Sequence, residues 1–175
     1  AEWDEFLAAG ASVADAEVTA RLQRLRGEDV ADILFTSGTT GQPKGVMSSH
    51  AQNIRVFDAW ATVVGLVHGD RYLIVNPFFH AFGYKAGWLA CLLRGATILP
   101  LAVFDADVVL QRIVEDRISV LPGAPTLFQS LLTNWERTPV DVSSLRLAVT
   151  GAASVPVALI ERMRSELGFR TVITG

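Results

Sequence analysis

The amino-acid sequence predicts an α/β fold, with a mostly parallel sheet that carries helices on both of its faces. Short, mainly apolar runs alternate along the chain with longer segments in which apolar residues recur at helical spacing. Glycine-rich turns follow three of the apolar runs, at residues 36–45, at Gly123 and at Gly151. This alternation is typical of parallel sheets, whose ligands bind beyond the carboxyl ends of the strands. The sequence therefore predicts a ligand site built from these turns.

The strands are expected in the mainly apolar runs, at residues 31–35, 71–76, 96–99, 118–121, 145–149 and 171–173. The first run, residues 31–35, leads directly into a polar, glycine-rich loop. Because four of its five residues are apolar, it is predicted to be a buried strand. No internal repeat interrupts this order.

The helices are expected between these strands, near residues 50–66, at 84–94, at 105–116, at 125–135 and after Pro156. Ser48 or Ser49 can cap the first of them, whose apolar positions include Ile54 and Val64. Gly95 is expected to end the second helix. Residues 1–29 are predicted to be a linker or an N-terminal helical segment, since Val18, Leu22 and Leu25 share one helix face. Residues 30–175 are predicted to form one partial subdomain.

Composition excludes several classes of protein. The 18 acidic and 15 basic residues give a net charge of -3, so no electrostatic argument favours nucleic acid or an anionic membrane as partner. The single cysteine, Cys91, excludes an intrachain disulfide and suits a reducing compartment. The sequence has neither a leader-like start nor an apolar run of about 20 residues. We therefore expect a cytoplasmic protein that is not integral to a membrane.

The most informative segment is the loop at residues 36–45, which holds three glycines, four hydroxyl side chains and Lys44. Backbone N–H groups, hydroxyls and an ammonium group all suit a polyphosphate. The loop is not a Walker motif, because Gly45 follows the lysine, and it contains no G-x-G-x-x-G pattern. An ordinary surface turn is the alternative, since Gly, Ser and Thr are common in turns.

The string Phe-Thr-Ser-Gly-Thr-Thr-Gly-Gln-Pro-Lys-Gly-Val at residues 35–46 resembles the AMP-binding signature of the adenylate-forming superfamily. Three further segments resemble this family in the same order, at residues 76–83, 121–126 and 150–156. The resemblance covers residues 30–175. Members of the family join a carboxylate to ATP, release pyrophosphate and pass the acyl group to a thiol, usually that of coenzyme A.

The resemblance implies roles for individual residues. His80 would be the catalytic residue, beside the acyl carboxylate. The residues that would bind the nucleotide are Thr36, Ser37, Gly38, Thr39, Thr40, Gly41 and Lys44 at the phosphates, and Gly151, Ala152 and Ala153 at the adenine. The substrate pocket would contain Phe79, His80, Phe82, Lys85 and Gly123.

Each assignment has a simpler alternative. His80, among phenylalanines, would otherwise be a core histidine, and Lys85 a solvated helix lysine. Cys91 is expected to be a small buried hydrophobe. Trp60 and the other tryptophans are expected to serve in packing rather than in ligand binding.

Resemblance also implies what this chain does not contain. The family's Tyr-Gly-x-Thr-Glu segment, whose Glu helps to hold Mg²⁺, would begin at about Gly175, and a hinge and a C-terminal domain would follow. We therefore expect a fragment of an ATP-dependent acyl-CoA ligase that requires ATP, Mg²⁺ and coenzyme A, has no metal ligand of its own and is inactive alone. A non-catalytic nucleotide-binding module and a purely structural fragment are the alternatives. Exposed apolar edges would favour self-association.

The substrate is expected to be a small carboxylic acid without an α-amine, because residues 76–83 contain no acidic side chain to pair with an ammonium group. A narrower resemblance, carried by residues 76–87, 121–123 and 148–153, is to the actinobacterial ligases that activate propanoate side chains of degraded sterol rings. Lys85 would then meet a ring ketone. A medium- or long-chain fatty acid is the alternative substrate.

Overall fold

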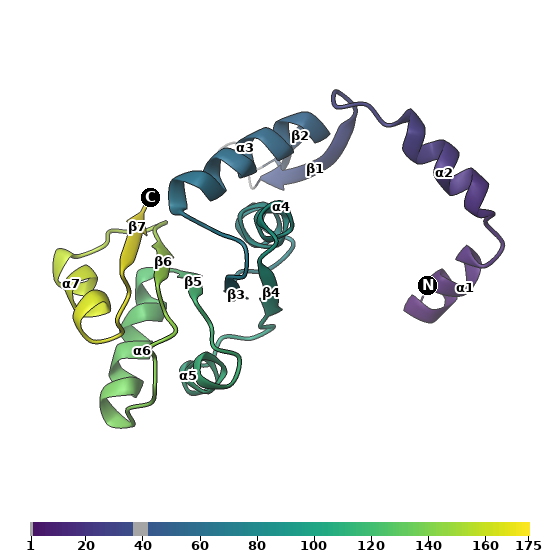
Figure 1. Cartoon of the computed structure of the whole chain (residues 1–175). Coiled ribbons are helices and arrows are strands. Elements are labelled where there is room, and N and C mark those ends of the chain that lie inside the picture. Colours follow the sequence, from purple (N-terminus) through teal and green to yellow (C-terminus); the bar gives the residue numbers. More distant parts are fainter. Residues whose placement is uncertain (1, 37–41) are drawn as a thin grey trace. The chain divides into compact units, whose positions relative to one another are not determined.

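The computed structural model describes residues 2–36 and 42–175, and these form two units, residues 1–53 and 54–175. The relative placement of the two is not defined, so each is described by itself (Figure 1). Among the described residues, no helix is long and apolar enough to cross a membrane.

The first unit contains two short helices and a β-hairpin. Its elements are α1 (Trp3–Gly10), α2 (Asp15–Arg24), β1 (Val30–Thr36), β2 (Lys44–Ser49) and the start of α3 (His50–Val64). The helix expected around Val18 and Leu22 is confirmed as α2, whereas α1 had no clear signal in the sequence. The cap of α3 is Ser49: its Oγ accepts from Gln52 N at 3.3 Å, and Gln52 Oε1 accepts from Ser49 N at 2.9 Å.

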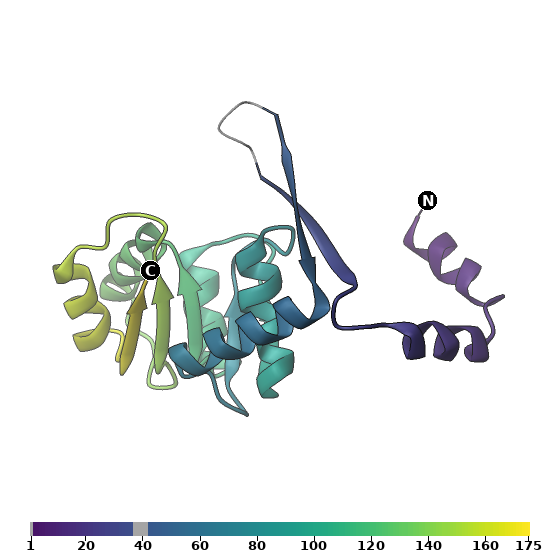
Figure 2. The ribbon, with the colours of Figure 1, turned by 90° about the horizontal axis from the view of Figure 1, so that it is seen from above.

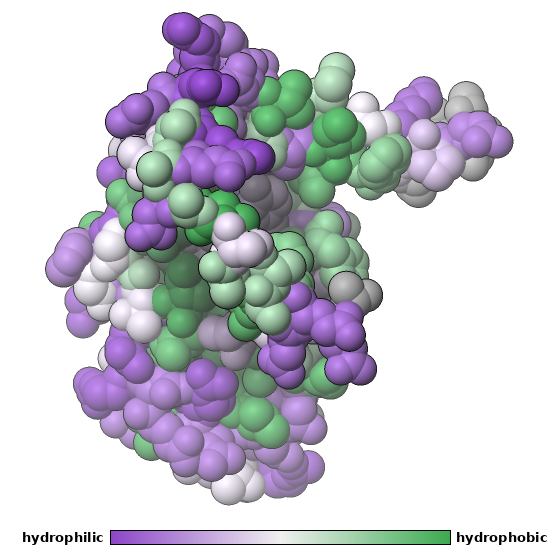
Figure 3. All heavy atoms as spheres, turned by 90° about the vertical axis from the view of Figure 1, so that its right-hand side faces the viewer, coloured by the Kyte–Doolittle hydropathy of each residue, from purple (hydrophilic) through white to green (hydrophobic). Residues whose placement is uncertain are grey.

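The strand predicted at residues 31–35 is confirmed as part of β1, but the prediction that it is buried is wrong. β1 pairs antiparallel with β2 and belongs to a separate two-stranded sheet, in which Leu34 lies opposite Val46. Ile33 is 51% exposed and Phe35 is 73% exposed. Lys44 and Gly45, expected in the loop, lie in β2. A two-stranded ribbon has no second layer within this unit, so apolar side chains on it stay accessible; hydrophobic surface along the hairpin is visible in Figure 3 (green).

The second unit is built on a five-stranded sheet in which every pair of neighbours is parallel. Its order is β4 (Thr97–Pro100), β3 (Arg71–Ile74), β5 (Val120–Gly123), β6 (Leu147–Thr150) and β7 (Thr171–Thr174). The predicted strands are confirmed here, with ends that differ by one or two residues. Because the strands run in the same direction, their carboxyl ends meet at one edge.

Helices cover both faces of this sheet, as predicted (Figures 1 and 2). α5 (Ala106–Glu115), α6 (Pro125–Arg137) and α7 (Val157–Ser165) pack on one face around Leu73, Leu121 and Ala148. The end of α3 and α4 (Ala90–Arg94) pack on the other face around Tyr72 and Leu147. Successive strand residues alternate between the two clusters, as the pleat requires.

Local signals in the sequence account for most helix ends in this unit. Asp105 caps α5 by accepting from Val108 N at 3.0 Å, and Pro125 occupies the first turn of α6. Gly95 ends α4 in the left-handed conformation, at φ 67°. The helix expected at 84–94 is confirmed, but its first part is a π-helix, η1 (Phe82–Leu89). Such wide turns are uncommon and frequently occur at functional sites.

One buried carboxylate joins the amino ends of three strands. Asp70, which is 4% exposed, accepts from Arg146 Nε at 2.7 Å, Ser119 Oγ at 2.8 Å and Val67 N at 2.9 Å. Burial alone would raise the pKa of Asp70, but these hydrogen bonds and the Arg146 charge hold its pKa below the usual value. This cluster fixes the sheet at the edge opposite the carboxyl ends.

Candidate functional site

A cavity of about 370 Å³ lies at the carboxyl edge of the five-stranded sheet. Its wall comes from the ends of β3, β5, β6 and β7, from η1 and from α3. The lining residues are Trp60, Asn76, His80, Phe82, Gly123, Ala124, Val149, Thr150, Gly151, Ala152, Ile173 and Gly175. This is the edge at which a parallel α/β sheet is expected to bind its ligand.

The cavity brings together several residues that the sequence singled out. His80, Phe82, Gly123, Gly151 and Ala152 all line it, although they come from three separate segments of the chain. These segments were expected to meet because each follows a strand of one parallel sheet.

The cavity wall does not include every residue expected there. The described residues that line the cavity do not include Phe79, Lys85 or Ala153. Phe79 lies at the surface and is 86% exposed. Trp60, expected to serve only in packing, forms part of the wall, where its ring meets that of Phe82 edge-on at 6.0 Å between centroids. The sequence did not predict this role for Trp60, because an apolar residue on a helix is ordinarily expected to pack in the core.

His80 is exposed, so its interpretation as a core histidine is wrong. The ring Nδ1 of His80 accepts a hydrogen bond from Phe82 N at 3.2 Å, and the backbone N–H of His80 donates to Pro77 O at 3.0 Å. Because Nδ1 is an acceptor, the neutral imidazole carries its proton on Nε2. Nε2 of the ring, which makes no hydrogen bond to Phe82 N, is therefore an N–H donor.

Gly83 allows the segment after His80 to fold tightly against the end of β3. A Cβ at this position would lie 2.3 Å from Pro77 O and 2.4 Å from Asn76 O. Both of these contacts are with backbone atoms, which cannot move aside as a flexible side chain can. The first turn of η1 consequently needs glycine here.

Lys85 is only 5% exposed, so its interpretation as a solvated helix lysine is wrong. Its Nζ lies 5.8 Å from the centroid of the Tyr84 ring, within the range of a cation–π contact. Cys91, in contrast, is the buried small hydrophobe that was expected: it is fully buried, and burial raises the pKa of its thiol to about 12.

The turn after β6 is held against the residues that follow β7. Ala152 N donates to Gly175 O at 3.3 Å, and Gly175 N donates to Thr150 O at 3.1 Å. Ala152 has φ 63°, a conformation that costs energy for a residue with a Cβ. Such strain is often found where a backbone turn is shaped for a ligand.

The expected phosphate-binding residues belong to the first unit. Ser37, Gly38, Thr39, Thr40 and Gly41 lie outside the described residues.

Thr36 and Lys44 lie opposite each other at the ends of β1 and β2, and both are exposed. The Thr36 hydroxyl donates to Lys44 O at 3.5 Å. The Lys44 ammonium is thus available to a ligand.

Within residues 2–36 and 42–175, no three His, Cys, Asp or Glu side chains form a group that could hold a metal ion. The described residues that line the cavity also include no carboxylate.

The second unit is thus an α/β unit with a cavity at the carboxyl edge of a parallel sheet. Comparison with known protein families identifies the family to which the chain belongs. Residues 2–175 match the model of the AMP-binding enzyme family, and the chain belongs to that family.

Two relatives are 3-[(3aS,4S,7aS)-7a-methyl-1,5-dioxo-octahydro-1H-inden-4-yl]propanoyl:CoA ligases. The one from Rhodococcus jostii is 53% identical over 174 residues, and the one from Mycobacterium tuberculosis is 55% identical over 173 residues. Each match covers 99% of this chain and 34% of the relative. The chain therefore spans about a third of the length of these relatives.

A solved structure of o-succinylbenzoate coenzyme A synthetase from Bacillus subtilis, in complex with ATP and a magnesium ion, is similar as well. The TM-score is 0.73 at 30% identity, and the match covers 86% of this chain and 31% of that one. The family assignment thus has support from both sequence and structure.

Proposed function

We propose that this chain supplies the acyl-binding and much of the nucleotide-binding surface of an ATP-dependent acyl-CoA ligase. The observation that carries the proposal is the cavity at the carboxyl edge, where His80 and Phe82 meet the turn of Gly151 and Ala152. Three of the four segments that resemble the family, at residues 76–83, 121–126 and 150–156, thus contribute to one cavity wall. The relatives that share half of the sequence are named as CoA ligases.

The adenine would lie against the turn that follows β6. This turn is largely backbone, and its geometry includes the strained Ala152. Thr150, which is 2% exposed, has a buried Oγ1 with no hydrogen-bond partner among the described residues. A flat base with polar edges suits such a surface, because it can stack on the peptide planes while it satisfies the hydroxyl.

The phosphates would bind to the loop between β1 and β2. Lys44 offers an exposed ammonium group at the end of β2, and Thr36 offers a hydroxyl at the end of β1. Ser37, Gly38, Thr39, Thr40 and Gly41 complete this proposed set with hydroxyls and backbone N–H groups. When ATP is bound, it supplies the activated phosphate that accepts the acyl carboxylate.

The acyl carboxylate would lie beside His80, whose Nε2–H can donate to a carboxylate oxygen. Carboxylate and triphosphate repel each other, so donors at fixed positions are needed to hold them together. Phe82 and Trp60 would exclude water from one side of the acyl group.

The substrate would be a carboxylic acid whose acyl group carries a ring. The relatives at 53% and 55% identity are named for a propanoyl group on a fused bicyclic ring with two oxo groups. The described cavity lining has no acidic side chain, which disfavours an amino acid because its ammonium group would be buried unpaired. A straight fatty acid is the alternative, and coenzyme A would be the acyl acceptor.

A chimera tests the proposal directly. The chain would replace the matching third of the Rhodococcus jostii ligase, and release of pyrophosphate would be measured with ATP and a set of ring-bearing and straight-chain acids. We expect release that depends on the acid. In that chimera, Lys44→Ala should raise the KM for ATP about tenfold or more, since it removes a charge-assisted hydrogen bond.

Lys44→Arg is the matched control, because it keeps the charge at the same place. If the chimera folds but no acid stimulates release of pyrophosphate, the proposed function is wrong. Nucleotide binding without turnover would instead favour a non-catalytic nucleotide-binding module.

A further inference from the structure

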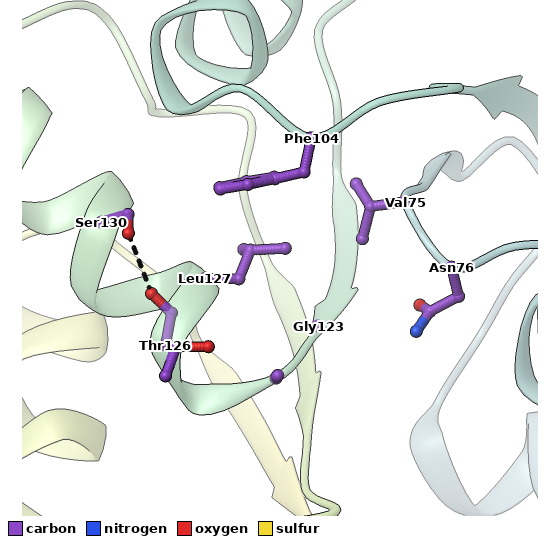
Figure 4. A pocket seen from close by; sticks show the side chains of 8 residues that line it. Val75, Asn76, Phe104, Gly123, Thr126, Leu127 and Ser130 are labelled. Atoms are coloured by element: carbon purple, nitrogen blue, oxygen red, sulfur yellow. Dashed lines mark hydrogen bonds between the residues drawn. The ribbon is translucent and has the colours of Figure 1, made fainter.

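Asn76 occupies a special place at the end of β3, because it lines two neighbouring cavities. One is the cavity described above. The other, of about 420 Å³, is lined by Val75, Asn76, Phe104, Gly123, Ala124, Thr126, Leu127 and Ser130 (Figure 4). The two cavities share Asn76, Gly123 and Ala124, so they meet at the ends of β3 and β5. Asn76 therefore borders both cavities.

The Asn76 side chain carries a buried polar atom that the described part of the chain leaves without a partner. Its Oδ1 is inaccessible to solvent and has no hydrogen-bond partner among the described residues. Figure 4 shows the amide directed into the space that the labelled residues surround. Nearly all buried polar groups in folded proteins are hydrogen-bonded, so an exception calls for an explanation.

Other polar side chains at these cavities have partners or stay accessible. The Ser130 hydroxyl donates to Thr126 O at 3.1 Å, one helical turn earlier. His80 Nδ1 accepts from Phe82 N, and Thr126 is exposed. Among the described residues that line the cavities, only Asn76 and Thr150 have a buried side-chain oxygen without a partner. Of these two, Asn76 is the one that lines both cavities.

We propose that Asn76 is a specificity-determining residue that hydrogen-bonds an oxygen substituent on the acyl part of the substrate. This inference rests on the proposed function. A side-chain amide suits this task because it has both an acceptor and two donors. Its oxygen accepts from a ring hydroxyl, and after a rotation of the amide its nitrogen donates to a ring ketone.

The same reasoning replaces Lys85 in the role first suggested for it. Lys85 was expected to meet a ring ketone, but it is not among the described residues of either cavity. Asn76, four residues before His80, lines the same cavity as that histidine. A polar group on the acyl part of the substrate, several bonds from the carboxylate, can therefore hydrogen-bond to Asn76 while the carboxylate lies at His80.

The test compares two acids that differ in one oxygen, in the chimera that carries this chain. The probes are 3-cyclohexylpropanoate and 3-(4-oxocyclohexyl)propanoate, and kcat/KM is measured for each. The parent should prefer the oxo acid about tenfold, the range expected for one hydrogen bond in an apolar site. Asn76→Leu, of similar size, should abolish this preference through KM for the oxo acid and leave the unsubstituted acid unchanged or improved.

Three more variants make the assignment specific. Asn76→Asp keeps the size and the acceptors but removes the donors, so it should lose the preference for the ketone even if the leucine variant fails to fold. Ser130→Ala is the matched control, because it removes a hydroxyl at the neighbouring cavity that already has a partner; it should change neither acid. Thr150→Val tests the other buried oxygen.

The outcomes separate this inference from the proposed function. Equal use of both acids by the parent, or a preference that survives in both Asn76 variants, overturns the inference and leaves the ligase function intact. Loss of the preference in Thr150→Val but not in the Asn76 variants assigns the contact to Thr150 and also overturns it. If neither these acids nor any other is activated by the folded parent chimera, the proposed function fails, and the role of Asn76 fails with it.

Discussion

The two units of this chain use the same local signals but differ in what their apolar side chains do. Within the described residues, every buried hydrophobic side chain lies between Ala61 and Phe169, in the second unit. The first unit has short helices and a paired β-hairpin, yet most of its large apolar side chains are exposed. These are Trp3, Phe6, Leu7, Val13, Val18, Leu22, Leu25, Val30, Ile33, Phe35, Val46 and Met47.

The difference shows that local pattern and burial are separate properties. Caps, turns and strand register depend on near neighbours in the chain. Burial depends on a second layer that closes over an apolar face, and the second unit has helices on both faces of its sheet. We therefore expect the free energy of unfolding to reside almost entirely in the second unit.

The largest effect should come from a core aromatic residue in the second unit. Phe128 is fully buried and packs edge-on against Phe169, with 5.9 Å between ring centroids. Phe128→Ala should lower the free energy of unfolding by about 3–5 kcal/mol, since it removes apolar contacts and leaves a cavity. Urea denaturation of the chain, followed by tryptophan fluorescence, measures this change.

Phe35→Ala in the first unit is the matched control. Because Phe35 is 73% exposed, its truncation should change the free energy of unfolding by less than about 0.5 kcal/mol. A comparable loss for the two variants would show that the hairpin is buried in solution, and would remove the contrast between the units.

The next effect should come from the buried carboxylate at the amino edge of the sheet. Asp70→Asn should cost about 3 kcal/mol, because it leaves Arg146 with no anion. The lowered pKa of Asp70 also makes stability depend on pH. A carboxylate with a lowered pKa stabilises the folded state above its unfolded pKa of about 3.9, and this contribution is lost as the pH falls further.

Thermal unfolding of the two proteins between pH 3 and 7 checks this prediction. The parent should lose more stability than Asp70→Asn as the pH falls below about 4. Parallel curves over the whole range would mean that Asp70 does not act through its charge.

Much of the second unit could be predicted from the sequence because its signals are local and repeated. Gly95, Pro125 and the alternation of apolar runs indicate helix ends and a parallel sheet, and that sheet brings His80 and Gly151 to one edge. The hairpin could not be predicted in the same way. The apolar run at residues 31–35 has the composition of a buried strand, and nothing in the run itself shows that it pairs with β2 in a separate two-stranded sheet.

Three features near the site could not be predicted from the sequence. The π-helix depends on hydrogen-bond register, which side-chain spacing does not encode. Lys85 is buried, although lysine is usually exposed. The unpartnered Asn76 oxygen follows from the packing around it, and composition cannot show this.

A smaller effect should be seen in thiol reactivity. Cys91 lies on α4 and is fully buried where this helix packs on the sheet, so a reagent has little access to it. Burial also raises the pKa of its thiol to about 12, so little thiolate forms at pH 8. Ellman's reagent should modify native Cys91 at least about a hundredfold more slowly than the unfolded chain. In a Cys91→Ala background, Phe35→Cys should react as fast as a free thiol. Rapid reaction of native Cys91 would show that this face of the sheet opens readily.

The smallest effect should come from removal of the helix caps. The loss of stability should be global for a cap in the second unit and local for a cap in the first. Asp105→Ala removes the cap of α5, which packs in the core of the second unit, so it should lower the free energy of global unfolding by about 1 kcal/mol. Ser49→Ala removes an equivalent hydrogen bond at the start of α3, in the first unit. Since that end of α3 is not supported by a core, its loss should fray the first turn and leave global unfolding unchanged. Hydrogen exchange at the Gln52 amide, measured beside urea denaturation, should therefore speed up for Ser49→Ala alone. A global loss of similar size for both variants would show that the two units unfold as one.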